Sequence, residues 1–287
     1  MMFDRFFSVL SLVSRIPVRR RFKFDVSRID FYLPVTGIFP AFLTLISCFL
    51  AMRLTGLGGF SVAAALVVQY LSFNLFHLDG LSDTADAFLG AVSREKRFDI
   101  LKDSRIGVYG LFAGISAFIL KLLLLYGLLK GVNSVFFDVP PERLLIFVYP
   151  VSGRLGAALI PCMTSPAKPT GLGALAAKSR ASFAFAGATV ALLVCLGVWL
   201  AATLVFAGTP PFSPLDGAPS NGGGFFIIAL CYFAVPLLAG VLSAAFYARV
   251  YSKALGGYSG DALGAAIESG ELICLLFIAA VSNFCAV

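Results

Sequence analysis

Aspartates are concentrated in one segment of this chain, residues 77–110, with the sequence HLDGLSDTADAFLGAVSREKRFDILKDSRIGVYG. Asp79, Asp83 and Asp86 are spaced i, i+4, i+7, so a helix would hold their carboxylates within roughly 60° of arc. Asp99 and Asp103 are spaced i, i+4 and would share one face of a second helical segment. Like charges on one face repel, so such a cluster is typical of a site that holds a cation. Carboxylate oxygens on facing segments suit Mg²⁺, Mn²⁺ or Ca²⁺.

A less specific interpretation of these aspartates stays open. The first three could form a solvated helix face at a membrane surface, although few basic residues lie near them in sequence to offset the charge. The last two could pair with Lys96, Lys102 and Arg105, as in a charged amphipathic linker. The cation site is therefore the sharper of two hypotheses.

The motif DSRIGVYG begins at the last of these aspartates and leads into a predicted helix. Ser104, Gly107 and Gly110 could present backbone N–H groups to a phosphate at that helix start. Arg105 could bind the same phosphate through two parallel hydrogen bonds. Glycines are common at helix starts. Carboxylates for Mg²⁺ beside an anion-binding helix start, however, are the usual elements of phosphoryl transfer.

Three further polar residues interrupt apolar surroundings. Arg154 lies in VSGRLG and Lys121 in FILKLLL, each inside a predicted membrane span. Charges at such positions are costly and face a partner or a wet cavity, although Lys121 could also extend to the membrane surface. His77, the one histidine of the chain, would lie about 160° around a helix from Asp79. That position favours a packed or hydrogen-bonded side chain over a metal ligand.

A second acidic segment, GGYSGDALGAAIESGE, occupies residues 256–271. Asp261 and Glu268 are spaced i, i+7 and would share a helix face, with Glu271 nearby. This segment opens the last predicted span from the side that carries the aspartates. We therefore expect it to approach the aspartate cluster.

The composition predicts an all-α, polytopic membrane bundle that forms one integral-membrane domain over residues 1–287. The chain is 59% hydrophobic and 13% charged, with a mean hydropathy of +0.94, whereas soluble domains carry about 25% charged residues. A helix needs about 20 apolar residues to cross a bilayer. Seven such spans are predicted, near residues 31–52, 58–78, 107–129, 144–163, 182–206, 225–248 and 263–286. Residues 1–15 instead predict an amphipathic helix that lies in the membrane interface.

The distribution of lysine and arginine predicts the orientation of this bundle. The seven-span arrangement places 17 of the 20 loop cations on one side, so the N-terminus and the acidic segment are predicted to be cytoplasmic, which implies the inner membrane. The Pro/Gly-rich segment 207–224 would be a flexible loop on the opposite side. The basic cluster Arg19, Arg20, Arg21 and Lys23 suits anionic lipid headgroups. Its place beside the membrane argues against a nucleic-acid partner.

Several of these motifs together resemble those of the cobalamin synthase, or adenosylcobinamide-GDP ribazoletransferase, family. The resemblance rests on HLDGLSDTADAF at 77–88, DILKDSRIGVYG at 99–110, GGYSGDALGAAIESGE at 256–271, SRIPV at 14–18 and YLPVTG at 32–37. These motifs cover the length of the chain, and the first two are specific. Ala87 stands where many relatives have glycine, which is a mild departure.

The resemblance implies a reaction on a pyrophosphate. In it, the 3′-hydroxyl of α-ribazole, or of its 5′-phosphate, attacks the cobinamide-side phosphorus of adenosylcobinamide-GDP. GMP leaves, and adenosylcobalamin or its 5′-phosphate forms. The family is Mg²⁺-dependent and membrane-embedded; Mn²⁺ is a possible substitute. The chemistry needs charge neutralisation, in-line positioning and a base for the hydroxyl.

The candidate residues fall into three expected roles. Asp103 is expected to be the base, with Asp86 as a second catalytic carboxylate. The expected metal ligands are the aspartates of the first segment: Asp79, Asp83, Asp86, Asp99 and Asp103. The expected substrate contacts are the remaining polar residues and glycines of the motifs: His77, Ser104, Arg105, Gly107, Gly110, Arg154, Asp261 and Glu268.

Two other functions remain as alternatives. CDP-alcohol phosphotransferases use DxxDG…DxxxD, and Asp83-Thr-Ala-Asp86-Ala with Asp99-Ile-Leu-Lys-Asp103 looks like a shortened version. The intervening positions of that motif do not match, which argues against a lipid synthase. A cation transporter would carry its acidic residues near the middle of its spans, whereas these cluster near a predicted membrane surface.

Overall fold

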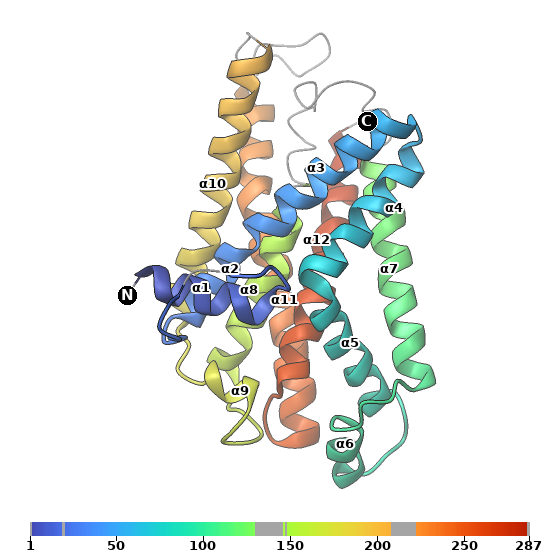
Figure 1. The fold of residues 1–287 in the computed structure, drawn as a ribbon, viewed down its shortest axis with the longest axis vertical. Helices are drawn as coiled ribbons and strands as arrows, with labels where there is room; N and C mark the ends of the chain where they lie inside the picture. Colours follow the sequence, from blue (N-terminus) through green and yellow to red (C-terminus); the bar gives the residue numbers. More distant parts are fainter. Residues whose placement is uncertain (1, 19–20, 130–145, 147, 208–221, 286–287) are drawn as a thin grey trace.

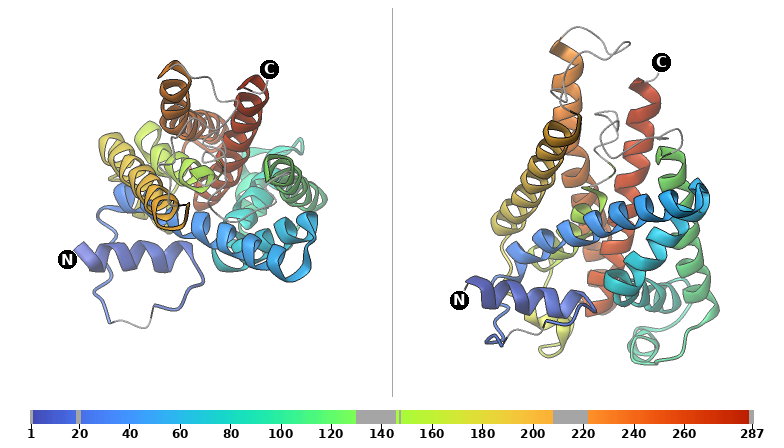
Figure 2. Two further views of the ribbon diagram at one scale, coloured as in Figure 1. Left: turned by 90° about the horizontal axis from the view of Figure 1, so that it is seen from above. Right: turned by 45° about the horizontal axis from the view of Figure 1, so that its top comes forward.

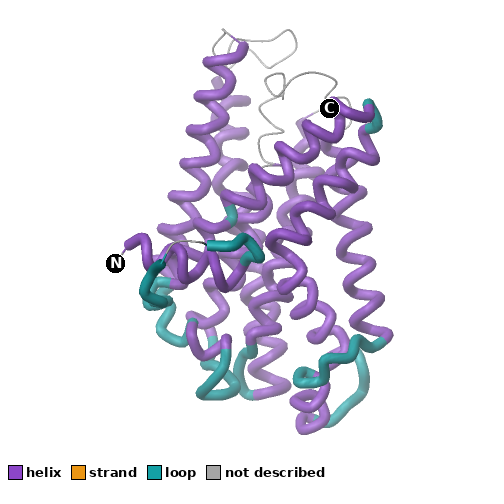
Figure 3. Tube along the Cα trace, in the orientation of Figure 1, coloured by secondary structure: helices purple, strands orange, loops and turns teal. Residues whose placement is uncertain are grey.

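The protein is helical throughout the residues that its computed structural model describes, which are 2–18, 21–129, 146, 148–207 and 222–285. The helices are α1 (Met2–Val13), α2 (Ile29–Thr36), α3 (Ile38–Thr55), α4 (Gly58–Gln69), the π-helical turn η1 (Tyr70–Asn74), α5 (Leu75–Phe88), α6 (Arg94–Ile100), α7 (Val108–Leu129), α8 (Tyr149–Met163), α9 (Leu172–Leu175), α10 (Ala181–Ala207), α11 (Gly222–Leu255) and α12 (Gly260–Cys285). No strand occurs in these ranges (Figures 1 and 3). The predicted all-α fold is confirmed.

Six stretches of helix within these ranges are long and apolar enough to cross a membrane: Ile29–Thr55, Gly58–Phe88, Val108–Leu129, Ala181–Ala201, Leu230–Leu255 and Gly260–Ser282. They confirm the polytopic membrane class and correspond to six of the seven predicted spans. The first two each join consecutive helices, α2 with α3 and α4 with α5. The predicted span at 144–163 is different, and its first residues lie largely outside the described ranges.

That seventh span corresponds to α8, which has 15 residues. At 1.5 Å per residue it is about 22 Å long, shorter than the roughly 30 Å hydrocarbon layer. Every residue of α8 from Tyr149 to Ile160 is buried. Its apolar composition therefore reflects burial among other helices rather than contact with lipid, and composition alone does not separate the two cases.

The core of the bundle lies where α8, α11, α12 and α5 pack against one another. Small residues permit this approach: a Cβ on Gly270 would lie 2.9 Å from the Cα of Gly153. A Cβ on Gly240 would lie 2.8 Å from the carbonyl oxygen of Ser152. Close contact between helices through small residues is the usual way in which membrane helices associate.

The first helix, α1, lies outside the bundle and across the direction of most of the long helices (Figure 2). Val9 and Val13 are buried, whereas Met2 and Phe3 are exposed. Its 12 residues are too few to cross a bilayer, which confirms an amphipathic helix rather than a span. Of the basic cluster predicted to contact lipid, residues 19 and 20 lie outside the described ranges, as does most of the predicted loop 207–224.

The chain returns to one end of the bundle at α6, at α9 and at the connection from α11 to α12 (Figure 1). Helix α12 runs from there to the opposite end (Figure 1). Helices α5 and α12 pack against each other along the way. The two acidic segments that the sequence singled out therefore meet in space, as expected.

Candidate active site

Helices α5 and α12 come into backbone contact through a pair of glycines. A Cβ on Gly80 would lie 2.9 Å from the carbonyl oxygen of Asp261, and one on Gly264 would lie 3.0 Å from that of His77. The first distance is closer than real Cβ atoms come, and the second is tighter than nearly all real Cβ contacts, so a side chain at either position would push the helices apart. The contact places the start of α12 directly against the acidic face of α5.

As a result, an acidic group forms from Asp79, Asp83 and Asp261. The carboxylates of Asp79 and Asp261 both lie near enough to that of Asp83 to repel it electrostatically, as does Asp86. Asp79 is exposed, whereas Asp83 and Asp261 are half-buried. Among the described residues, no lysine or arginine forms an ion pair with any of the three.

The chemistry of this acidic group fits a hard divalent cation. Its donors are carboxylate oxygens, which are the ligands that Mg²⁺ prefers, and no basic side chain in the described ranges neutralises them. As the side chains are arranged, no three His, Cys, Asp or Glu residues among those described are close enough together to hold a metal ion. The predicted metal site stays a prediction, and binding would require these carboxylates to converge.

Asp86 contacts the start of the next helix instead of facing open space. The backbone N–H of Gly107 donates to one of its carboxylate oxygens at 2.7 Å, and that of Gly110 donates to the other at 2.8 Å. A Cβ on either glycine would collide with this carboxylate. The amides that we expected to bind a phosphate are therefore bonded to a carboxylate of the protein. The glycines allow that carboxylate to reach the positive end of α7.

Asp103 is paired with Arg105 rather than with the other aspartates. The Arg105 guanidinium lies 2.6 Å from the Asp103 carboxylate. Hydrogen bonds from the Arg105 side chain and backbone, with a smaller contribution from Lys96, lower the pKa of Asp103 to about 2. Asp99 and Ser104 are exposed. Of the five expected aspartate ligands, only Asp79 and Asp83 thus belong to the acidic group, since Asp86 bonds to the start of α7. Asp99 and Asp103 lie outside that group.

Arg154 and Glu268, which we expected to contact substrate, belong to a fully buried ionic network. Arg154 lies 2.9 Å from Glu271, and Lys121 lies 2.9 Å from Glu268 and 2.7 Å from Glu271. All four side chains are 0% exposed. Two cations and two carboxylates balance, which is the arrangement in which buried charges are tolerated. The expectation that both intramembrane cations have partners is confirmed, and Lys121 does not extend to the surface.

The π-helical turn completes this network. The hydroxyl of Tyr70 donates to Glu268 at 2.7 Å. The Asn74 amide donates to Glu268 at 2.8 Å and to Glu271 at 3.1 Å. Tyr70 and Asn74 are the first and last residues of η1, and π-helical turns often occur at functional sites. Sequence reasoning missed both residues, because only the tertiary structure shows that their face meets α12.

His77 is buried on α5, near enough to Arg154 and Lys121 for their charges to act on it. It is 2% exposed, and within the described ranges neither ring nitrogen has a hydrogen-bond partner. The structure therefore agrees with a packed histidine, although its ring is not hydrogen-bonded. Its contact with substrate stays a prediction.

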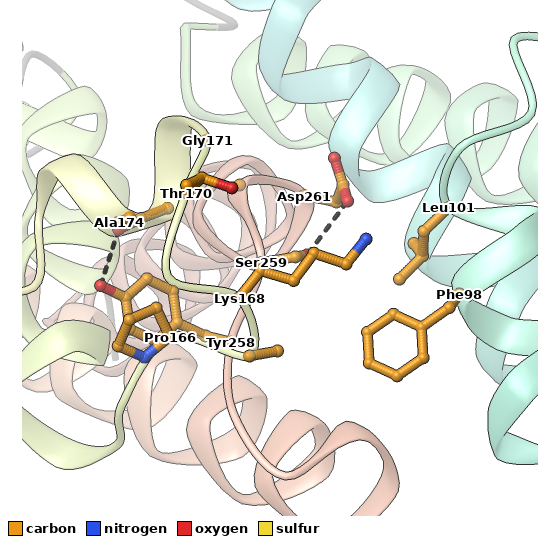
Figure 4. Close-up of a pocket in the computed structure, with 13 residues that line it drawn as sticks. Phe98, Leu101, Pro166, Lys168, Thr170, Gly171, Ala174, Tyr258, Ser259 and Asp261 are labelled. Carbon is orange, nitrogen blue, oxygen red and sulfur yellow. Dashed lines mark hydrogen bonds between the residues drawn. The ribbon is translucent and has the colours of Figure 1, made fainter.

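A pocket opens beside Asp261 at the same end of the bundle (Figure 4). Its walls come from the end of α6, from the connection between α8 and α10, and from the connection between α11 and α12: Phe98, Leu101, Pro166, Ala167, Lys168, Thr170, Gly171, Gly173, Ala174, Tyr258, Ser259, Gly260 and Asp261. Sequence reasoning missed Lys168 and Thr170. The signal available was a cation within a Pro/Gly-rich loop, SPAKPTGLG, on the predicted side of the aspartates.

Comparisons with known proteins bear on this site. The family model described as cobalamin-5-phosphate synthase matches residues 5–279. A relative from Treponema denticola, named adenosylcobinamide-GDP ribazoletransferase, is 32% identical over 276 residues, which are 94% of this chain and 95% of the relative. Relatives of the same name from Shigella boydii and Escherichia coli are 31% and 30% identical, and each match covers 94% of this chain and 97% of the relative. No solved structure matches.

Proposed function

This chain belongs to the cobalamin-5-phosphate synthase family and is a transferase of cobalamin biosynthesis, and we propose how its residues perform that reaction. The 3′-hydroxyl oxygen of α-ribazole, or of its 5′-phosphate, forms a bond to the cobinamide-side phosphorus of adenosylcobinamide-GDP. The bond from that phosphorus to the bridging oxygen breaks, and GMP leaves with the electron pair. The hydroxyl proton passes to a base or to water.

The observation that carries this proposal is the acidic group on α5 and α12. The contact between Gly80 and Gly264 brings Asp261 to the face that bears Asp83. A pyrophosphate brings several negative charges, and its transfer depends on positioning and on charge stabilisation. Carboxylates without basic partners can supply both only through a cation, so their presence beside a pocket suits a metal-dependent phosphoryl transfer.

We assign Asp79, Asp83 and Asp261 as the residues that would hold Mg²⁺, with Mn²⁺ as a substitute. When bound, the ion would neutralise charge on the pyrophosphate and on the departing GMP. Asp86 is assigned a positioning role, because both of its oxygens accept backbone N–H groups of α7. Asp103 remains the candidate base from the sequence, although its pairing with Arg105 makes it a weak one.

The alternatives receive less support from the same residues. A cation transporter would place acidic residues along a path through the bundle, whereas Glu268 and Glu271 are already balanced by Lys121 and Arg154. A CDP-alcohol phosphotransferase also cleaves a nucleotide diphosphate ester. Only the alcohol that accepts the phosphoryl group therefore distinguishes that function from the proposed one. The experiment must therefore vary the acceptor.

The test is release of GMP from adenosylcobinamide-GDP by the purified full chain in lipid nanodiscs. We expect release to require α-ribazole or its 5′-phosphate and to stop when EDTA removes the metal. Asp83→Asn and Asp261→Asn should each lower turnover by about 100-fold or more, in line with lost charge stabilisation. Glu95→Gln, at an exposed site on α6, is the matched control. A wild-type chain that releases no GMP with either acceptor would exclude the proposal.

We also propose that the pocket end of the bundle faces the cytoplasm in the inner membrane. The six apolar helices indicate a multi-pass protein, and the excess of loop cations supports the orientation. In a chain without native cysteines, Ser93→Cys at the start of α6 and Thr55→Cys at the end of α3 should react with an impermeant thiol reagent from opposite sides. Reaction from the same side would refute the orientation.

A further inference from the structure

Lys168 is the single lysine or arginine among the residues that line the pocket. In Figure 4 its side chain extends across the pocket toward Asp261 and the ring of Phe98. Its ammonium lies 5.1 Å from the centre of that ring. Lys168 also acts electrostatically on Asp261, yet the described residues contain no carboxylate within ion-pair distance of it. The cation is therefore close to the acidic group without being neutralised by it.

The backbone around Lys168 is held in a defined position. The Ala167 N–H donates to the carbonyl oxygen of Tyr258 at 2.8 Å, and the Tyr258 N–H donates to that of Ser165 at 3.0 Å. The Tyr258 hydroxyl donates to the carbonyl oxygen of Gly173 at 2.8 Å. These bonds fasten the connection between α8 and α10 to the connection that opens α12. Lys168 is thus fixed relative to Asp261 by backbone contacts rather than by an ion pair.

Thr170 lines the same wall, two residues farther along the chain, and is exposed. Its hydroxyl can donate a hydrogen bond, and the Lys168 ammonium can donate three. The pocket thus presents hydrogen-bond donors on one side and, on the other, carboxylates that suit a metal cation. A phosphorylated ligand can use both. Such a ligand can bind a metal ion through some of its oxygens and an ammonium through others.

We propose that Lys168, assisted by Thr170, binds a phosphate group of a substrate in this pocket. The inference rests on the proposed function and deepens it by assigning the residues that hold the phosphate. Two sources have the required chemistry: the pyrophosphate of the nucleotide donor, and the 5′-phosphate of a phosphorylated acceptor. In the second case, Lys168 determines the preference for α-ribazole 5′-phosphate over α-ribazole.

The experiment compares Lys168→Gln with the wild-type chain in nanodiscs, measuring kcat and KM for the donor and for each acceptor. A hydrogen bond between charged groups corresponds to about tenfold or more in affinity. A donor site predicts that the KM for adenosylcobinamide-GDP rises at least about tenfold with both acceptors. An acceptor site predicts that only the KM for α-ribazole 5′-phosphate rises. Lys168→Arg should recover most of the loss in either case, because the charge is kept.

Lys178→Gln is the control, since Lys178 is exposed in the same connection and does not line the pocket. Calorimetric titration with the affected substrate should show the same loss of affinity as the KM. If the wild-type chain turns over but Lys168→Gln leaves every KM within about twofold of the wild type, the inference is wrong and the proposed function still stands. A fall in kcat alone also overturns the inference, because Lys168 would then act in the transition state rather than in binding the substrate. Absence of wild-type turnover would count against the proposed function instead.

Discussion

The ammonium of Lys121 on α7 lies 2.7 Å from the carboxylate of Glu271 on α12, and neither side chain is exposed. These residues are 150 positions apart in the chain. With Arg154 and Glu268 they form a neutral set of four charges at the centre of the bundle. The network joins α7, α8 and α12, with Glu268 and Glu271 farther along α12 than Asp261, so it fixes the helices that carry the candidate active site.

Replacing one member of this network should destabilise the protein strongly. Lys121→Met leaves two carboxylates facing one arginine, and an uncompensated buried charge costs about 3–5 kcal/mol. We expect the detergent-solubilised variant to unfold at a clearly lower temperature in a thermal melt. The double variant Lys121→Met with Glu268→Gln restores charge balance and should recover part of the loss. Lys102→Met, at an exposed position, is the control, and equal melting of Lys121→Met and wild type would contradict the network.

The glycine contact between α5 and α12 should be sensitive to a single methyl group. In Gly80→Ala the new Cβ would meet the carbonyl oxygen of Asp261 at 2.9 Å, so the helices must separate. Overpacking of this kind costs about 1–3 kcal/mol, and the displaced Asp261 should lower turnover. Gly127→Ala is the matched control, because a Cβ added there would meet no described atom within 4 Å. Unchanged turnover in Gly80→Ala would show that the contact does not position the site.

Asp86 should act mainly on the start of α7. Asp86→Ala removes the acceptor for the N–H groups of Gly107 and Gly110, and loss of such a cap costs about 0.5–2 kcal/mol. Hydrogen–deuterium exchange over residues 107–111 should become faster, while exchange in α10 stays the same. Asp86→Asn keeps one carbonyl oxygen and should show a smaller effect. Unaltered exchange in Asp86→Ala would assign the residue to chemistry instead of positioning.

The pH dependence of the reaction tests whether Asp103 is the base. Arg105 lowers the pKa of Asp103 to about 2 from its ordinary 3.8, so the carboxylate is ionised at every pH above about 4. Because the folded-state pKa is depressed, any stability from this pair is present above 3.8 and is lost as the pH falls through about 2. An acidic limb of kcat/KM above about pH 5 should therefore persist in Asp103→Asn. Disappearance of that limb would assign the base to Asp103.

Much of the architecture could be predicted from the sequence, because membrane helices are read from apolar length. The pairing of Lys121 and Arg154 with carboxylates was also predictable, since an isolated charge inside a bundle is costly. The shortness of α8 was not, because a helix buried by protein and one buried by lipid are equally apolar. Hydropathy identifies the environment of a helix as apolar without saying what provides it.

The candidate site was predicted in part for a related reason. The spacing of Asp79, Asp83 and Asp86 correctly placed them on one helix, but successive residues of this set contact different parts of the protein. Asp83 faces Asp261, while Asp86 reaches the backbone of Gly107. The proposed role of Lys168 depends on a loop that is bonded to Tyr258, a residue far along the chain. Such long-range contacts leave no periodic pattern in the sequence.

The π-helical turn at Tyr70–Asn74 sets the direction in which the side chains of α5 point around the helix axis, and the candidate active site depends on that direction. A turn of this kind contains one residue more than an α-helical turn would need. Deleting one residue there would let the segment close as ordinary α-helix, and everything after it would rotate by about 100° about the helix axis. Asp79 and Asp83 would then turn away from α12 while the span kept its length and hydrophobicity. An insertion or deletion that a membrane anchor would tolerate is, at this one place, equivalent to losing the site.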